Sequence, residues 1–137
     1  MNDHFSLSDA EFAQQFSDLT LNPTLFSHEA HLRLAWIHLV QFGEQQAIAN
    51  ITLQIRKFAT FHGDPGKYNE TVTVAAIKAV YHFLQKSKSD NFGDFITEFP
   101  RLKTNFKDLM AYHYKMDIYK LPEAKHRYLE PDLLPFT

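Results

Sequence analysis

Apolar residues recur along this chain mostly at intervals of three and four, the spacing of one face of an α-helix. Turn residues divide this pattern into four main stretches: about residues 9–19, 27–42, 44–62 and 69–86. Ser8 and Glu11 form a capping box before the first stretch, and Gly43 ends the second. Because residues 27–42 are apolar almost all the way round, we expect this helix to be surrounded by protein.

After residue 86 the apolar pattern becomes shorter and more aromatic, and it predicts two short helices, at about 92–99 and 104–114. Prolines favour an extended C-terminal tail, and the large apolar residues of that tail should pack on the helices. No segment alternates cleanly between apolar and polar residues, as a half-buried strand would. The sequence therefore predicts an all-α fold: a single helical domain over residues 1–137, with a bundle of about four main helices, short helices and an extended tail.

Composition narrows the class of protein. The 14 basic and 16 acidic residues show no basic cluster, which disfavours a nucleic-acid partner. The chain has no cysteine, so thiol catalysis and Cys-ligated metal centres are excluded. No run approaches the ~18 apolar residues of a membrane span, and the first residues do not resemble a signal peptide. We expect a soluble, cytoplasmic protein without a membrane partner.

His28 and His31 are the sharpest chemical feature of the sequence. Three residues apart on a helix, their Cβ atoms lie on one face, about 5–6 Å from each other. Imidazoles bind zinc, iron, nickel and manganese, so the pair could hold part of a divalent metal site. His38 is about 10 Å further along the helix axis, too far to join them. Glu70 is the best further ligand, which gives a predicted metal set of His28, His31 and Glu70.

A second polar group, Tyr68, Asn69 and Glu70, lies at the start of the fourth main helix. One interpretation is capping: Asn69 and Glu70 satisfy free amides, while Thr71 and Thr73 bond back to the backbone. The other is a pocket that this group forms with the histidine pair, with Trp36 nearby. The candidate ligand-binding residues are then His28, His31, Trp36, Tyr68, Asn69 and Glu70.

Two familiar motifs are excluded. A zincin needs two histidines four residues apart, whereas His28 and His31 are three apart. A phosphate-binding P-loop needs a glycine where this chain has Phe61, and a serine or threonine where it has Tyr68.

Phe26-x-His28-x-x-His31-Leu32-Arg33-x-Ala35-Trp36, followed by Tyr68-x-Glu70-Thr71-x-Thr73, resembles a family of small, functionally uncharacterised bacterial helical proteins. The family pattern reads F-x-H-x-x-H-L-R-x-A-W and Y-H-E-T-x-T, followed by a Tyr-rich segment and a P-D-L tail. The chain departs from it at Asn69, where the family has histidine. If that histidine is a third metal ligand in the family, this chain lacks it. The resemblance then implies a ligand pocket of His28, His31, Tyr68 and Glu70.

The sequence thus predicts a helical-bundle protein whose His/Tyr/Glu pocket binds a small molecule or a metal ion. If the protein is an enzyme, His31 is the general base or a ligand, and Glu70 is the carboxylate that orients it or the acid. The alternative is a non-enzymatic interaction module that acts as a homodimer through exposed aromatic residues. The sequence does not decide whether the protein is an enzyme, and it does not identify the ligand.

Overall fold

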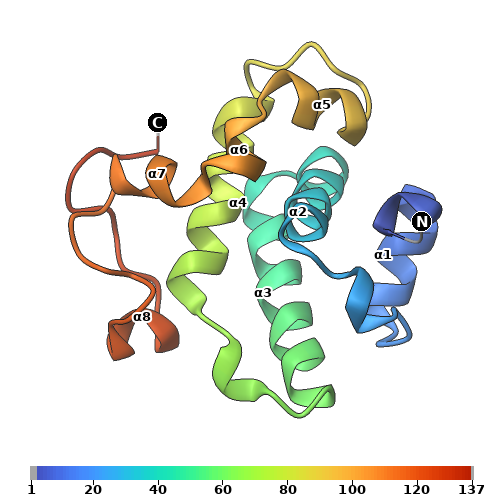
Figure 1. The fold of residues 1–137 in the computed structure, drawn as a ribbon, viewed down its shortest axis with the longest axis horizontal. Coiled ribbons are helices and arrows are strands. Elements are labelled where there is room, and N and C mark those ends of the chain that lie inside the picture. Colours follow the sequence, from blue (N-terminus) through green and yellow to red (C-terminus); the bar gives the residue numbers. More distant parts are fainter. Residues whose placement is uncertain (1–2, 137) are drawn as a thin grey trace. The chain divides into compact units, whose positions relative to one another are not determined.

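The computed structural model describes residues 3–136 (Figure 1). In this range the regular elements are α-helices and short 3-10 helices, and no strand is present. The predicted all-α fold is therefore confirmed. Among residues 3–136, no helix combines the length and the apolar character needed to cross a bilayer.

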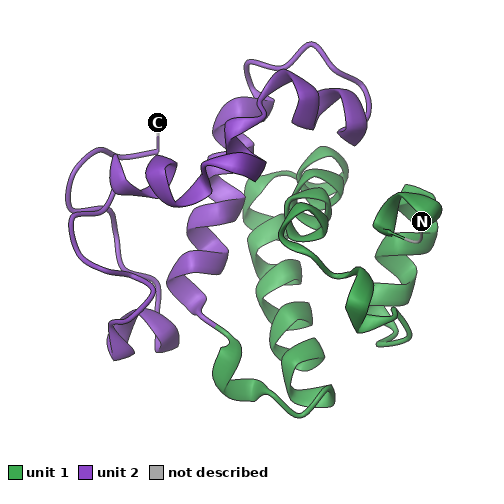
Figure 2. Ribbon diagram, viewed as in Figure 1, with its two compact units in different colours: residues 1–68 green, residues 69–137 purple. Residues whose placement is uncertain are grey.

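The chain packs as two compact units, residues 1–68 and 69–137 (Figure 2). The sequence predicted one domain over residues 1–137, and this stays a prediction. Each unit is described in turn.

The first unit is built on three α-helices joined by short 3-10 helices. Its elements are η1 His4–Ser6, α1 Asp9–Ser17, η2 Pro23–Leu25, α2 His28–Phe42, α3 Glu44–Phe61 and η3 Pro65–Lys67. The predicted capping box is confirmed: the Ser8 hydroxyl accepts from the Glu11 amide, and the Glu11 carboxylate accepts from the Ser8 amide. Helix α1 ends at Ser17, two residues earlier than expected, and Leu19 follows with a left-handed φ of 65°.

Helices α2 and α3 are separated by Gly43 alone. This residue has a φ of 83°, a conformation that glycine adopts without steric cost, and its amide donates to the Leu39 carbonyl. Helix α2 packs against α3, and α1 contacts both. The residues of α2 from Leu32 to Leu39 are all buried, as predicted for an interior helix, but Val40 and Phe42 at its end are exposed.

The second unit is built on one long helix and four short ones. Its elements are α4 Glu70–Leu84, α5 Phe92–Glu98, α6 Arg101–Thr104, α7 Phe106–Ala111 and α8 Pro122–His126. The helix expected at 104–114 is the shorter α7, and the short helices α6 and α8 were not predicted. Helix α8 packs against α4, and α6 packs against α7.

The C-terminal tail lies against the residues that follow α7. The amide of Leu133 donates to the carbonyl of His113 at 3.0 Å, and the amide of Leu134 donates to the carbonyl of Tyr112 at 3.4 Å. The ring of Phe136 stacks on His113, with 4.0 Å between the ring centroids. The tail is thus held against residues 112–113, and Phe136 packs as predicted, but Leu133 and Leu134 stay exposed at 50% and 58%, contrary to the expectation that the large apolar tail residues pack on the helices.

Candidate functional site

The predicted histidine pair lies in the first turn of α2. Ser27 is the N-cap, and its hydroxyl accepts a hydrogen bond from the amide of Ala30 at 3.2 Å. His28 is the first residue of the helix and His31 the fourth. Both are exposed, so solutes can reach this end of α2.

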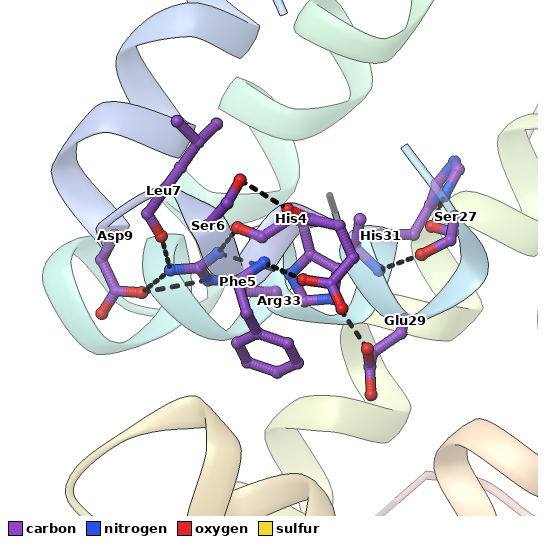
Figure 3. A network of polar contacts seen from close by, with 11 residues as sticks. His4, Phe5, Ser6, Leu7, Asp9, Ser27, Glu29, His31 and Arg33 are labelled. Atoms are coloured by element: carbon purple, nitrogen blue, oxygen red, sulfur yellow. Dashed lines mark hydrogen bonds and ion pairs between the residues drawn. The ribbon is translucent and has the colours of Figure 1, made fainter. Parts of the chain in front are cut away.

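The His31 ring has a defined orientation. Its Nδ1 lies 2.9 Å from the backbone carbonyl oxygen of Ser27 (Figure 3). Since a carbonyl oxygen only accepts hydrogen bonds, Nδ1 carries the proton and Nε2 holds the lone pair of the neutral ring. The ring also stacks on Phe26 with a centroid distance of 3.7 Å, and Phe26 itself packs on Phe16 and Phe58.

These surroundings favour the neutral form of His31. Desolvation lowers the pKa of His31, and the nearby His28 lowers it further, while the hydrogen bond with Ser27 opposes the shift. The result is an imidazole that is neutral and presents Nε2 as an acceptor.

Trp36 and Tyr68, two further predicted pocket residues, have different environments. Trp36 is 6% exposed and belongs to the buried part of α2. Tyr68 is half-buried after η3, and the guanidinium of Arg56 lies over its ring, 6.0 Å from the centroid. Their roles in ligand binding stay predictions.

Asn69 caps α4, as the capping interpretation predicted. Its side-chain oxygen accepts from the amide of Val72 at 3.0 Å, and its amide nitrogen donates to the carbonyl of Ile118 at 2.9 Å. The Thr73 hydroxyl donates back to the Asn69 carbonyl at 2.7 Å, also as predicted. Both polar atoms of the Asn69 side chain therefore make hydrogen bonds to the backbone within the second unit.

Thr71 does not make the local backbone bond that was expected. Its buried hydroxyl donates to the carbonyl of Arg127 at 2.8 Å and accepts from the amide of Leu129 at 3.0 Å. Thr71 thus connects α4 with the segment that follows α8. The reason is tertiary: a chain segment distant in sequence offers both a donor and an acceptor to one hydroxyl.

Glu70 is the first residue of α4 and is half-buried. Its assignment as a third metal ligand stays a prediction from the sequence. Across residues 3–136, no three side chains of His, Asp or Glu gather as a ligand set for a metal ion. In the first unit, His28 and His31 lie in one turn of α2, and their role as metal ligands stays a prediction.

The sequence reasoning missed a buried polar network on the neighbouring face of α2 (Figure 3). Arg33, 4% exposed, donates to the carbonyls of His4 and Leu7 and to the carboxylate of Asp9. Glu29 was expected at the surface, but its carboxylate lies 2.8 Å from Nε2 of the buried His4. A signal was present: Arg33 is a charged residue within an apolar run, and such a residue needs partners when it is buried.

Comparisons of this chain with protein-family models, with curated proteins and with solved structures find no match. The likeness to the bacterial family stays a prediction that rests on the motifs alone.

Proposed function

We propose that this protein binds a small molecule or a divalent metal ion through His28 and His31. One observation carries the proposal: the Ser27 carbonyl holds the proton on Nδ1 of His31, so that Nε2 presents its lone pair at an exposed helix start. Metal-binding histidines in proteins commonly donate their second N–H to a backbone carbonyl, which sets the tautomer and orients the ring.

The neutral state of His31 supports the same proposal. A metal ion binds only the deprotonated nitrogen, so a ring whose pKa is lowered loses less affinity to protons at mildly acidic pH. His28, one turn earlier on the same helix, is the second imidazole. Two imidazoles leave coordination positions for water or for a ligand's own oxygen atoms.

The same geometry serves a metal-free ligand. Nε2 of His31 can accept a hydrogen bond from a bound molecule, and a neutral imidazole with one nitrogen available is the form that acts as a general base. Metal titration separates the two versions of the proposal, because only one of them requires the ion.

The test is calorimetric titration of the full chain, without a histidine tag, with Zn²⁺ or Ni²⁺ alone. We expect one saturable site per chain. Loss of a residue that only orients a metal ligand weakens metal sites about 10–100-fold, so His31→Ala or His28→Ala should weaken binding at least as much. His126→Ala is the matched control, because it removes another exposed histidine and should leave the affinity unchanged. Equal loss in all three variants, or no saturable binding, contradicts the metal version.

Self-association is a second candidate function, supported by large apolar side chains that are exposed in the first unit. Val40 is 58% exposed, Phe42 47% and Phe61 62%. Val40 and Phe42 lie at the end of α2 and Phe61 at the far end of α3, so they offer two separate apolar contacts to a partner copy. Sedimentation velocity over a range of protein concentrations tests the homodimer. We expect a mass that rises with concentration and an association that weakens in Phe61→Ser, whereas a monomer at every concentration contradicts it.

A further inference from the structure

The second unit contains a cavity of about 210 Å³. Helix α4 lines it with Ala79, His82 and Phe83, which lie on one helix face because they are spaced by three and four residues. Further walls come from Arg101 of α6, from Leu109, Met110, Tyr112 and His113, and from Phe136 of the tail. Elements distant in sequence thus meet around one hollow.

The polar groups of this cavity are cationic or neutral. Its lining includes Arg101, His82, His113 and Tyr112, and no Asp or Glu of the described residues takes part. The chain as a whole has a net charge of −2, so this lining differs from the average surface. Such a lining favours an anion and disfavours a cation.

Arg101 is the strongest anion-binding group of the set. Its guanidinium lies over the ring of Tyr112, 5.8 Å from the centroid, and makes no ion pair with a carboxylate of residues 3–136. A guanidinium that lies over an aromatic ring keeps its N–H donors directed outward in its own plane. These donors match the two oxygens of a carboxylate.

The tail orients His113. Its Nδ1 donates to the carbonyl of Leu134 at 2.8 Å, and its ring is stacked on Phe136. In the neutral ring the remaining nitrogen, Nε2, is then a hydrogen-bond acceptor with a defined direction. His82 makes no side-chain hydrogen bond or ion pair with the described residues; its ring packs edge-on against Phe83. Both imidazoles can therefore bond to a guest in the cavity.

The remaining walls are apolar. Phe83, Leu109, Met110 and Phe136 offer the flat and flexible surfaces that pack against a ring or a compact hydrocarbon. The volume lies below the ~300–1,000 Å³ that is typical of sites for drug-sized ligands. The fitting ligand is accordingly small, with one acidic group and one apolar body.

We propose that the cavity among α4, α6, α7 and the tail binds a small organic carboxylate whose apolar body is a single ring or a group of similar size. The carboxylate pairs with Arg101 and accepts a hydrogen bond from a ring N–H of His82, and the ring packs against Met110 and Phe136. This site is separate from the histidine pair of α2 and uses none of its residues.

The probe is benzoate, and the readout is methyl NMR of the full chain labelled at methionine. Met110 lines the cavity and Met116 does not, so benzoate should shift the Met110 methyl signal in a saturable way and leave Met116 in place. Phenyl phosphate tests whether the anion can be a phosphate. Benzamide and benzylamine keep the ring but replace the carboxylate with a neutral and a cationic group, and we expect each to bind at least about tenfold more weakly.

Arg101→Gln removes the charge at an exposed residue, and we expect it to weaken benzoate binding by about tenfold or more. Arg127→Gln is the matched control, because it makes the same chemical change at an exposed arginine of this unit that does not line the cavity. An amide spectrum that keeps the wild-type pattern outside the cavity shows that each variant is folded.

Three results overturn the proposal: benzoate shifts no methionine, it shifts Met116 as much as Met110, or both arginine variants weaken binding equally. Benzoate binding in His31→Ala keeps the two proposals distinct. It should equal that of the wild type, so metal binding at α2 and anion binding in the cavity can each fail without the other.

Discussion

The guanidinium of Arg33 donates a hydrogen bond to the backbone carbonyl of His4 across 2.6 Å, joining α2 to a residue 29 positions earlier. The same side chain reaches the carbonyl of Leu7 at 2.9 Å and the carboxylate of Asp9 at 2.8 Å. Its flat face lies near Phe12, 5.0 Å from the ring centroid. One planar group therefore donates hydrogen bonds to the carbonyls of the turn that leads into α1, and these bonds hold that turn against α2.

Removal of this guanidinium should destabilise the protein strongly. Arg33→Met keeps much of the apolar stem but leaves the carbonyls of His4 and Leu7 without their donor, and we expect a loss of about 3 kcal/mol in the free energy of unfolding. The loss in the free energy of unfolding for Arg33→Lys should lie between zero and that of Arg33→Met, because a single ammonium cannot reproduce the planar arrangement of donors. Urea denaturation measures both.

Arg56→Met is the control for Arg33, because Arg56 is exposed on α3 and its main hydrogen bond is to the Thr52 carbonyl in its own helix. Arg56→Met should change the free energy of unfolding by no more than about 0.5 kcal/mol, as other surface substitutions do. Similar losses at residues 33 and 56 contradict the role given to the buried network.

Thr71→Val should destabilise the second unit, because valine has the shape of threonine without the hydroxyl. The part-buried carbonyl of Arg127 and amide of Leu129 then lose their partner, which we expect to cost about 1–2 kcal/mol. Hydrogen exchange of the Leu129 amide should accelerate. Thr71→Ser keeps the hydroxyl and should retain the slow exchange; exchange at the wild-type rate in Thr71→Val is the opposing result.

Asn69→Asp separates the two bonds of the α4 cap. Aspartate still accepts from the Val72 amide, but it cannot donate to the carbonyl of Ile118, and two oxygens then face each other. We expect a loss of about 1 kcal/mol, of the same order as loss of the cap itself in Asn69→Ala. Thermal unfolding compares them; a fully stable Asn69→Asp shows that the bond to Ile118 contributes little.

The pKa of His31 predicts a pH dependence of stability. Desolvation and His28 lower the folded-state pKa from 6.5 to about 4, so the unfolded chain binds more protons between these values. The stabilising contribution of His31 is therefore complete above about pH 6.5 and declines as the pH falls toward 4. Unfolding free energies of wild type and His31→Gln, measured at several pH values, should converge on acidification.

Long-range ¹H–¹⁵N spectra of the imidazole give the same information directly. They should show the proton on Nδ1 at neutral pH and a midpoint well below that of a solvated histidine. A midpoint near 6.5, or a proton on Nε2, contradicts the environment described for this ring.

The helices were readable from the sequence because their signals are local. The Ser8 box, Gly43 and the apolar face of α2 involve neighbours within one or two turns, and the structure has each of them. Helices α6 and α8, with four and five residues, are too short to show a helical period in the sequence. In the structure α6 packs against α7 and α8 packs against α4.

The candidate sites were readable only in part for the same physical reason. The His28–His31 spacing and the cap at Asn69 follow from position along one helix. The partners of Arg33 and Thr71, and the meeting of Arg101 with His113, depend on chain segments brought together from a distance. A single sequence does not encode such pairs as a pattern.

The single-residue connection at Gly43 bears on how the chain folds. Docking α2 on α3 requires closure of almost no loop, whereas the bond of Arg33 to His4 has to close 29 residues. Contacts between near neighbours in sequence form at a lower entropic cost and therefore sooner. We expect the α2–α3 hairpin to form first, and the N-terminal turn to dock on it late in folding.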